Sequence, residues 1–424
     1  MAATAILTED RENGQVNPAK AQPEWPPVVV GGAYQTGIML MRHLVRAGLE
    51  VCAFDSDPRR PGFHTRYGKV FLCPNPDQQP DEWLRFMLDL AKRVGRKPVL
   101  IPTSDQFLAS IAKFAGQLRE HFIFTPSIAL QAEVGTKDNQ YDIAERHGFP
   151  TPRTRLIGSL ESLEEFMGGA RFPCLLKPLS ARHWDSAPRS HPLYLKKVMV
   201  GETAAELAGY YALAREFDPQ VVVQEVITGP DTAKLVYLSC YDRNGKRLGS
   251  CVLRELRTDP MGFGSAGLVE PLQAPDVDAL CDAFVQSLGY TGLCELELKR
   301  DSRDGQVRLI EINPRYSVTA DAAPYAGVNL GWLHYLDLIG QEVEPVRQNS
   351  NDYRHVVLQR DLPNLGSYRK AGLLTWKELR HSYRSPVYFF DLDPYDWRVT
   401  VRTMLEVGWR LFGRPWMRRF IPRR

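Results

Sequence analysis

The sequence has no long hydrophobic run and no regular cysteine pattern. Nowhere do eighteen consecutive apolar residues occur, so no helix is expected to span a membrane. The seven cysteines are scattered, without a C-x-x-C pair or metal-ligand spacing. This argues against a disulfide framework and indicates reduced, buried thiols in a cytoplasmic protein.

The first 25 residues also lack an apolar run and carry acids at Glu9, Asp10 and Glu12. They do not resemble a signal peptide, and we expect residues 1–25 to form a disordered lead. The whole chain has 424 residues, 44% of them hydrophobic, which is too long for one compact core. Two or three domains are expected.

Positive charge is concentrated at one end of the chain. From Trp397 onward there are eight arginines and one acid, Glu406, although the net charge of the whole sequence is only +3. The rest of the chain is therefore close to neutral. Because basic residues gather only in this tail, nucleic-acid binding is not supported.

The N-terminal part has the pattern of a nucleotide-fold βαβ unit. Val28–Val30 predicts a buried strand, residues 31–37 form a glycine turn, a helical pattern follows, and residues 50–54 predict a second strand that ends at Asp55. The spacing is G-G-x-x-x-x-G and not the dinucleotide pattern G-x-G-x-x-G. The turn therefore favours a structural or substrate-side role over an NAD site.

A third strand, residues 98–101, ends in polar residues Thr103, Ser104 and Asp105. Ligands gather at the carboxyl ends of parallel strands, so these side chains are candidates for contacting a small polar substrate. Ser and Asp are also common N-caps, here for a helix over residues 107–114. Both interpretations are compatible.

Two later strands carry the most informative pattern. Because side chains alternate along a strand, Glu295 and Glu297 share one face, and Glu311 and Asn313 share a face of the next strand. Antiparallel pairing of the two strands would bring Glu297 and Glu311 together. Carboxylate and amide oxygens are the ligands that Mg²⁺ prefers when it also holds phosphate. The alternative is a half-exposed hairpin with solvated charges.

Pro314 and Arg315 follow Asn313 directly. The set Glu297, Glu311, Asn313, Pro314 and Arg315, together with the order of the predicted strands, resembles the ATP-grasp superfamily over about residues 28–335. Within it, the chain resembles the D-aspartate ligase-like carboxylate–amine ligases. The resemblance implies an α/β and α+β fold with a Rossmann-like pre-ATP-grasp domain (26–130). An ATP-grasp domain (131–340) follows, with a small lid (about 150–228) and a C-terminal antiparallel sheet. Residues 341–424 are an extension containing a basic amphipathic helix.

The resemblance also implies roles for individual residues. Glu297, Glu311 and Asn313 correspond to the ligands of Mg²⁺, expected as two ions with Mn²⁺ as a substitute. Arg315 corresponds to a residue that contacts phosphate or the acyl phosphate, and Arg254 and Arg257 to a basic strand on the phosphate and substrate side. For ATP, the implied residues are phosphate-binding Lys137 and Lys177, the adenine hinge Gln224, Glu225, Val226 and Ile227, and ribose-binding Asp231.

The sequence departs from the family pattern near both lysines. Thr136 precedes Lys137 where many relatives carry Asp, and the glycine-rich loop expected after Lys177 is replaced by residues 180–184. Lid contacts to phosphate are therefore expected from other residues of that segment, namely Ser180, Arg182 or His183.

The function implied is an ATP- and Mg²⁺-dependent ligase. Its small-molecule carboxylate becomes an acyl phosphate, and an amine then attacks to give an amide, ADP and phosphate. Two alternatives are a kinase-like protein that stops at phosphoryl transfer and a non-catalytic nucleotide-binding regulator. The oligomeric state is open, with a homodimer among the options.

The basic tail has a helical stripe. Trp397, Val401, Leu405, Trp409, Phe412 and Trp416 recur at intervals of three and four. A basic amphipathic helix of this kind can lie on an anionic membrane surface, which would bring a cytoplasmic protein to the inner face of the membrane. The alternative is a helix docked on its own domain with its arginines in solvent.

Overall fold

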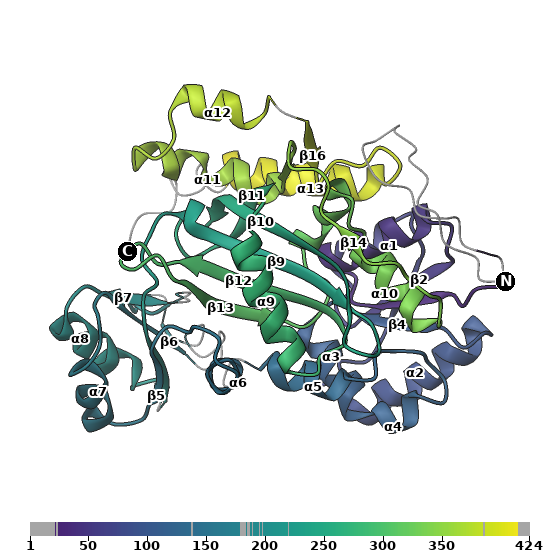
Figure 1. Cartoon of the computed structure of the whole chain (residues 1–424), viewed down its shortest axis with the longest axis horizontal. Helices are drawn as coiled ribbons and strands as arrows, with labels where there is room; N and C mark the ends of the chain where they lie inside the picture. The colour runs from purple at the N-terminus through teal and green to yellow at the C-terminus, as the bar shows by residue number, and fades with distance from the viewer. Residues whose placement is uncertain are drawn as a thin grey trace. The chain divides into compact units, whose positions relative to one another are not determined.

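The computed structural model describes residues 22, 24–136, 139–178, 184, 187–188, 190–194, 196, 198–218, 220–384 and 386–413. The chain divides into two compact units (Figure 1). Unit 1 consists of Met1–Gly135, Pro230–Glu297 and Ile312–Arg424, and unit 2 of Thr136–Gly229 and Leu298–Glu311. The predicted lid, about residues 150–228, falls within unit 2, and the other domain boundaries stay predictions.

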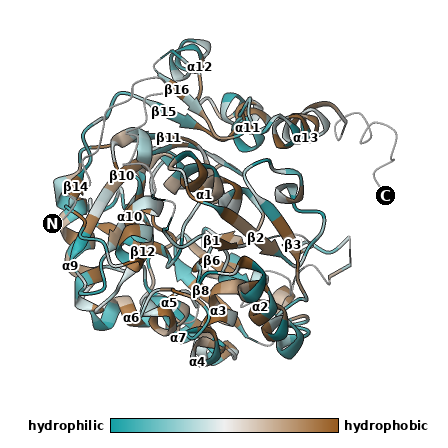
Figure 2. Ribbon diagram, turned by 90° about the vertical axis from the view of Figure 1, so that its right-hand side faces the viewer, coloured by the Kyte–Doolittle hydropathy of each residue, from teal (hydrophilic) through white to brown (hydrophobic). Residues whose placement is uncertain are grey.

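Unit 1 opens with a four-stranded parallel sheet in the order β3-β2-β1-β4. Its central strands are rich in buried aliphatic residues, as a sheet covered on both faces requires (Figure 2). The strands predicted at residues 28–30, 50–54 and 98–101 are confirmed to within one residue. The strands are β1 (Val28–Gly31), β2 (Val51–Asp55), β3 (Lys69–Leu72) and β4 (Val99–Pro102).

The glycine turn after β1 is a close approach of backbone to backbone. Gly32 has φ +115°, and a Cβ on Gly37 would lie 1.9 Å from the Gly32 carbonyl oxygen. Helices follow the strands, and Ser104 caps α3 by accepting a hydrogen bond from the Phe107 N–H at 3.3 Å, which confirms the capping prediction. The helices are α1 (Gln35–Arg46), α2 (Pro80–Val94), α3 (Asp105–Lys113), α4 (Ala115–Leu118) and α5 (Ile128–Val134).

The large sheet has the order β13-β12-β9-β10-β11-β15-β16, with β14 beside β10. β10 pairs antiparallel with β9 and with β11, whereas β14 pairs in parallel with β10 and β16 in parallel with β15. β12 and β13 are neighbours, as the sequence predicted. The chain leaves unit 1 within β12 and returns to it within β13. The strands are β9 (Lys234–Tyr241), β10 (Arg247–Asp259), β11 (Ser265–Pro271), β12 (Gly292–Arg300), β13 (Val307–Asn313), β14 (Val346–Arg347), β15 (Arg354–Val356) and β16 (Val387–Phe389).

One hydrophobic core joins the two sheets of unit 1. It combines residues of β1 and α1, such as Val30 and Leu44, with Val236 of β9 and Trp332 of α10. The later helices of unit 1 follow the strands of the large sheet or lie in the C-terminal segment. The last of them, α13, continues into a π-helical turn, η6 (Trp409–Gly413). The helices are α9 (Pro275–Ser287), α10 (Leu330–Leu338), α11 (Leu358–Lys370), α12 (Trp376–Ser382) and α13 (Trp397–Gly408).

Unit 2 contains a small antiparallel sheet in the order β5-β8-β6-β7. Its own core, which includes Phe166, Trp184 and Tyr211, packs between this sheet and two helices. The elements are α6 (Gln140–Arg146), β5 (Thr154–Ile157), α7 (Leu160–Met167), β6 (Cys174–Pro178), β7 (Met199–Gly201), α8 (Ala204–Ala214) and β8 (Val221–Glu225).

Candidate active site

A cluster of carboxylates surrounds one amide in unit 1. Glu295 and Glu297 lie two residues apart on β12 and therefore on the same face of the sheet. The side-chain amide of Asn313, at the end of β13, donates to Oε1 of Glu295 at 2.9 Å and to Oε1 of Glu297 at 3.1 Å. Strand alternation thus gathers three oxygen-bearing side chains at one point.

Glu295 is the most buried member of this cluster, and the predicted metal ligands did not include it. Its Oε2 accepts hydrogen bonds from the hydroxyls of Ser317, at 2.5 Å, and Thr319. Burial raises the pKa of Glu295, while these hydroxyls and Arg315 act in the opposite direction. The two-residue spacing from Glu297 was the sequence signal for its place beside the predicted ligand.

Arg315 lies next to the cluster and is held in two directions. Its guanidinium donates to Oδ1 of Asn313 at 3.0 Å, and its Nε lies 2.6 Å from Oδ1 of Asp105. Asp105 is the first residue of α3, and its side chain is 64% exposed. An ion pair with so exposed a partner is weak, so Arg315 can exchange Asp105 for another anion at small cost.

The donor set fits a magnesium ion that also holds phosphate, because it consists of carboxylate and amide oxygens. For Asn313 to act as a ligand, its Oδ1 would exchange the hydrogen bond that it now accepts from Arg315. Glu311 is half-buried, two residues before Asn313 on β13. Within the described part of the chain, no three His, Cys, Asp or Glu side chains converge on one point. Glu297, Glu311 and Asn313 stay predicted metal ligands.

A β-bulge decides which residues of β10 face this cluster. The pairing of β10 with β11 slips between Glu255 and Arg257, so Leu256 has no partner residue in the register. In a regular strand, Arg254 and Arg257 would point to opposite faces because they are three residues apart. The bulge places both arginines on one face and Glu255 on the other.

The packing shows which face is which. Leu253, on the face of Glu255, belongs to the same core as Leu293, on the face of Glu295. Leu268, which pairs with Arg257, belongs to a different core. Glu255 therefore shares a face with the carboxylate cluster, and the two arginines lie on the opposite face.

Both arginines are engaged in ion pairs on that opposite face. Arg257 is buried and binds Asp361 of α11 through two nitrogens, at 2.6 and 2.8 Å. Arg254 pairs with Glu270 of β11, with Nε at 3.1 Å from Oε1. This geometry gives no support to the predicted catalytic role of Arg254 and Arg257, which stays untested. The sequence could not show the bulge that sets their orientation.

Lys234, Glu255 and Asp231 form a buried ionic cluster that the sequence analysis did not predict. Lys234 Nζ is 3.8 Å from Oε2 of Glu255 and 3.6 Å from Oδ1 of Asp231. Burial raises the pKa of Glu255 to about 7. Asp231, the predicted ribose ligand, also accepts from the Gly262 N–H at 3.1 Å and from the Tyr368 hydroxyl. Its ribose role stays a prediction.

In unit 2, the predicted nucleotide residues lie on neighbouring strands. Lys177 is the next-to-last residue of β6, and its Nζ lies 5.3 Å from the centre of the Tyr141 ring. The Gln224 amide donates to the Thr154 hydroxyl at 2.7 Å. Lys137, Ser180, Arg182 and His183 lie outside the described residues.

The hinge segment is already partly hydrogen-bonded within unit 2. The Glu225 carboxylate accepts from the backbone N–H of Arg171 at 2.8 Å. Both backbone groups of Val226 are used, because its N–H donates to Pro173 and its carbonyl accepts from Arg303. Ile227 follows directly, and the hinge role of residues 224–227 stays a prediction.

Comparison with known proteins identifies the family of this fold. No family model matches the chain. The chain is 26% identical to D-aspartate ligase of Enterococcus faecium over 325 residues. The aligned region covers 72% of this chain and 75% of that protein. The chain belongs to the ATP-grasp superfamily.

Solved ATP-grasp structures share its architecture. The biotin carboxylase domain of Hydrogenobacter thermophilus 2-oxoglutarate carboxylase, solved with MgADP, superposes with a TM-score of 0.58 at 17% identity, covering 78% of this chain and 73% of that one. An L-amino acid ligase from Bacillus licheniformis gives 0.54 at 16% identity, covering 74% of each chain. The ATP-grasp fold, with a parallel N-terminal sheet, a small antiparallel sheet and a large C-terminal sheet, is confirmed.

Proposed function

We propose that this ATP-grasp protein is an ATP- and Mg²⁺-dependent ligase that joins a carboxylate to an amine. The carboxylate receives the γ-phosphoryl group of ATP, the amine displaces phosphate from the acyl phosphate, and the products are an amide, ADP and phosphate. The observation that carries the proposal is the convergence of Glu297 and Asn313, with Arg315 beside them, in a chain similar to D-aspartate ligase.

The proposed metal ligands are Glu297, Glu311 and Asn313. Bound Mg²⁺ would neutralise phosphate charge and orient the reacting oxygens. Glu295 keeps Asn313 in place, since it accepts the amide hydrogen bond and is itself fixed by two hydroxyls. Arg315 is proposed to leave the exposed Asp105 and to stabilise charge on the acyl phosphate.

For the nucleotide, Lys177 and Lys137 are the proposed phosphate ligands, and Asp231 is the proposed ribose ligand. Because both backbone groups of Val226 are engaged, the adenine contact is proposed to fall on the neighbouring backbone of Ile227. A positive side chain at the end of β6 suits this task, since phosphoryl transfer between anions depends on neutralising charge.

Amino acids are the proposed substrate class. D-aspartate ligase and L-amino acid ligase are both named for amino-acid substrates, and the chain resembles the first in sequence and the second in fold. All seven cysteines are unpaired, which supports a reducing compartment and hence the cytoplasm as the proposed location.

The test is ADP release by the purified protein with Mg²⁺ and ATP, measured against pools of amino acids, other carboxylic acids and amines. Turnover that needs an acid and an amine together is expected. Glu311→Gln should lower kcat by at least about 100-fold, because it removes a ligand needed in the transition state. Glu344→Gln, an exposed acid far along the chain from the cluster, is the matched control and should leave kcat unchanged.

The other outcomes separate the alternatives. ADP release that needs an acid but no amine, with a stable phosphorylated product, would indicate a kinase-like protein. ATP binding without turnover in any pool would indicate a nucleotide-binding regulator. Equal rates for the Glu311→Gln variant and the unmodified protein would contradict the proposed metal site.

A further inference from the structure

The C-terminal helix α13 is docked with its apolar stripe facing outward. The stripe consists of Trp397, Val401, Leu405, Trp409 and Phe412, whose side chains are between 49% and 73% exposed. The helix contacts the rest of unit 1 through its other side, where Thr403 and Val407 are 5% and 4% exposed. The largest hydrophobic side chains of this helix are thus left in solvent.

Specific bonds hold the helix in this orientation. Arg410 pairs with Asp259 of β10 at 2.6 Å and also donates to the Gln359 carbonyl. Arg402 donates to the carbonyl of Arg59 at 2.7 Å. At the start of the helix, Asp396 accepts from the Thr65 hydroxyl and from the Arg66 N–H at 3.1 Å. The stripe is therefore presented by a fixed helix.

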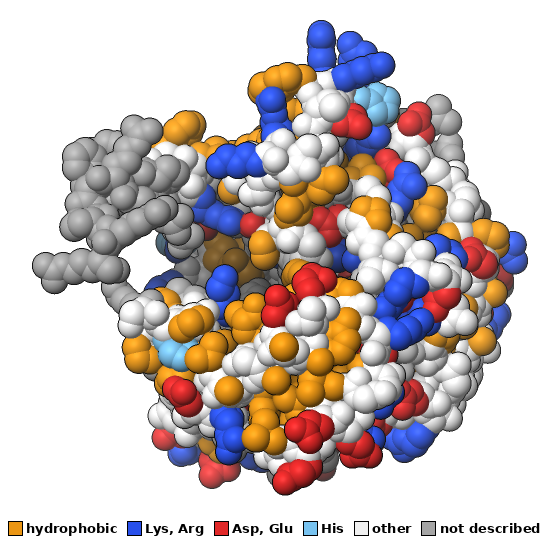
Figure 3. All heavy atoms as spheres, turned by 90° about the vertical axis from the view of Figure 1, so that its left-hand side faces the viewer, with side chains coloured by type: hydrophobic (Ala, Val, Ile, Leu, Met, Phe, Trp, Pro, Cys, Tyr) orange, Lys and Arg blue, Asp and Glu red, His pale blue; other side chains and the backbone are white. Residues whose placement is uncertain are grey.

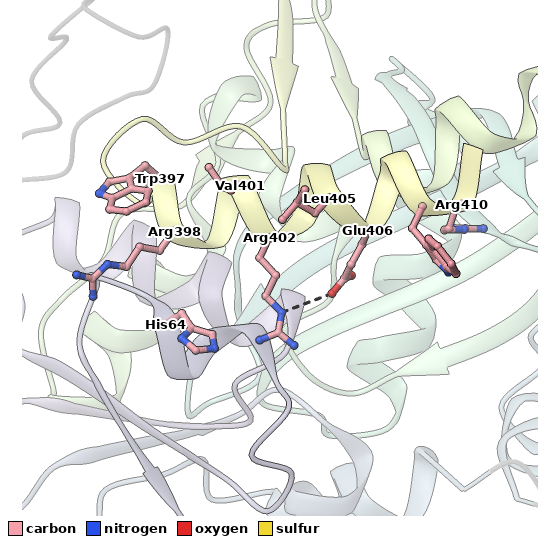
Figure 4. A pocket seen from close by; sticks show the side chains of 9 residues that line it. His64, Trp397, Arg398, Val401, Arg402, Leu405, Glu406 and Arg410 are labelled. Atoms are coloured by element: carbon pink, nitrogen blue, oxygen red, sulfur yellow. Dashed lines mark ion pairs between the residues drawn. The ribbon is translucent and has the colours of Figure 1, made fainter. Parts of the chain in front are cut away.

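The stripe borders an open groove of about 820 Å³ (Figure 4). Figure 4 shows Trp397, Val401 and Leu405 along the helix, with His64 across from Arg402. The lining also includes the basic residues Arg398 and Arg410 and one acid, Glu406. Glu406 forms an ion pair with Arg402 at 3.5 Å, so the lining has an excess of positive charge.

Two more arginines lie beside the helix, and the sequence that follows it is basic. Arg59 and Arg66 lie in the segment that receives the helix, and Arg66 is placed over the Tyr395 ring at 4.8 Å. Five more arginines follow in the sequence, at positions 414, 418, 419, 423 and 424. An aromatic and aliphatic stripe flanked by arginines is complementary to a surface with apolar depth and anionic headgroups.

We propose that the outward stripe of α13 and η6 docks on an anionic lipid bilayer, with the helix lying in the plane of the interface. Leu405 and Phe412 would enter the acyl boundary, Trp397 and Trp409 would lie at headgroup depth, and Arg398 would contact lipid phosphates. A second copy of the chain fits less well, because two such faces would bring arginines against arginines. The proposal does not depend on the ligase activity.

The test is flotation of the full chain with vesicles of phosphatidylcholine containing about one third phosphatidylserine. Binding is expected with these vesicles and not with pure phosphatidylcholine. Raising salt from about 0.1 M to about 1 M should release the protein, since screening shortens from about 10 Å to about 3 Å. Equal flotation with both vesicle types, or flotation with neither, would overturn the proposal.

Variants test whether the stripe is the contact. Leu405→Gln with Trp409→Gln should lower vesicle affinity at least about tenfold, because both exposed side chains lose apolar burial. Arg398→Glu should lower it at least about fivefold through charge alone. The matched control is Leu373→Gln with Trp376→Gln, a similarly exposed Leu–Trp pair at the start of α12 and just before it. Lys and Arg side chains also gather around α12, as Figure 3 shows, so the control surface is basic too.

The control pair should keep full binding, and all variants should keep the melting temperature of the unmodified protein, because none of these side chains is buried. Equal loss from both pairs would overturn the assignment to α13. A protein that ignores vesicles, but sediments as a dimer that the Leu405–Trp409 variant converts to monomer, would show that the stripe serves self-association instead.

Discussion

The carboxyl of Glu255 is buried, and its pKa lies close to neutral pH. Burial raises its pKa to about 7, and Lys234 at 3.8 Å only partly offsets this. The folded state therefore binds the proton more tightly than the unfolded chain. The stability that this group contributes is full below pH 4.5 and is lost as the pH rises to 7.

Glu255→Gln should flatten this pH dependence. The unmodified protein is expected to lose up to about 3 kcal/mol of unfolding free energy from this group between pH 5 and pH 8, and the variant should not. Urea titrations at several pH values measure it. Some slope should remain in the variant, because burial also raises the pKa of Asp391 to about 6. Identical slopes in both proteins would contradict the assignment.

The two arginines of β10 should differ in their effect on stability. Arg257 is 5% exposed and its partner Asp361 is fully buried, so Arg257→Gln leaves a buried charge unpaired and should cost about 3–5 kcal/mol. Arg254 is 39% exposed, and Arg254→Gln should cost about 1 kcal/mol or less. Urea denaturation measures both. A loss of kcat in Arg254→Gln at unchanged stability would instead support the catalytic role predicted from the sequence.

At the residue scale, the sequence predicted what simple alternation controls. Glu297 and Asn313 meet because each strand places every second side chain on the same face, whereas the predicted meeting of Glu297 with Glu311 stays a prediction. The same rule fails across Leu256, since a bulge depends on how two strands pair and not on the residues of one strand. Glu255 and Lys234 were missed because Lys234 begins β9 and Glu255 lies in the second half of β10, so their proximity depends on how these two strands pair.

At the scale of elements, a buried acid ties the first helix to a C-terminal strand. The carboxylate of Asp321 binds Nε2 of His43 on α1 and Nε2 of His355 on β15, each at 2.7 Å. These two hydrogen bonds keep the pKa of Asp321 well below its usual range despite full burial. The stability from this group is present above about pH 4 and is lost as the pH falls further.

Asp321→Asn should lower the unfolding free energy at pH 7 by about 3 kcal/mol. The amide is uncharged and has one acceptor oxygen, whereas the carboxylate offers one oxygen to each imidazole. Urea denaturation measures the change. Asp352→Asn, an exposed acid near the same strand, is the control and should shift the free energy by less than about 0.5 kcal/mol. Similar losses in both variants would contradict the proposed role of the buried bridge.

Helices and strands with a regular hydrophobic pattern were predictable from the sequence, whereas the docked side of α13 and the shortest strands were not. The N-terminal strands and helices follow hydrophobic periodicity, and the tail forms a helix from Trp397 as predicted. Which side of that helix docks was not predictable, because small side chains at Thr403 and Val407 make the contact while the larger apolar ones stay outside. The short strands β15 and β16 were also missed, since three residues carry too little periodicity.

At the scale of the whole molecule, the chain crosses between the two units at four places. A single truncation therefore cannot yield unit 2 with both of its segments. Ligand binding is best measured on the full chain, and Mg²⁺ with ATP at about 100 times the dissociation constant should raise stability by about 2.7 kcal/mol. For a protein of this size, that corresponds to a melting temperature about 3 °C higher.

Differential scanning fluorimetry measures this shift. Glu297→Gln should reduce it when Mg²⁺ is present, because the variant lacks one of the proposed metal ligands. The shift with ATP alone, in excess EDTA, should be the same for the variant and the unmodified protein. A variant that keeps the full Mg²⁺-dependent shift would contradict the role of Glu297 as a metal ligand.

The seven thiols also decide how the molecule can be labelled. Six are buried and Cys52 is half-buried, and burial raises the pKa of Cys52 to about 11, so thiolate is scarce throughout at neutral pH. A cysteine introduced at an exposed position such as Leu405 would therefore react with maleimide dyes well before the native thiols. An environment-sensitive fluorophore can thus be attached to the stripe of α13 without first replacing any native cysteine.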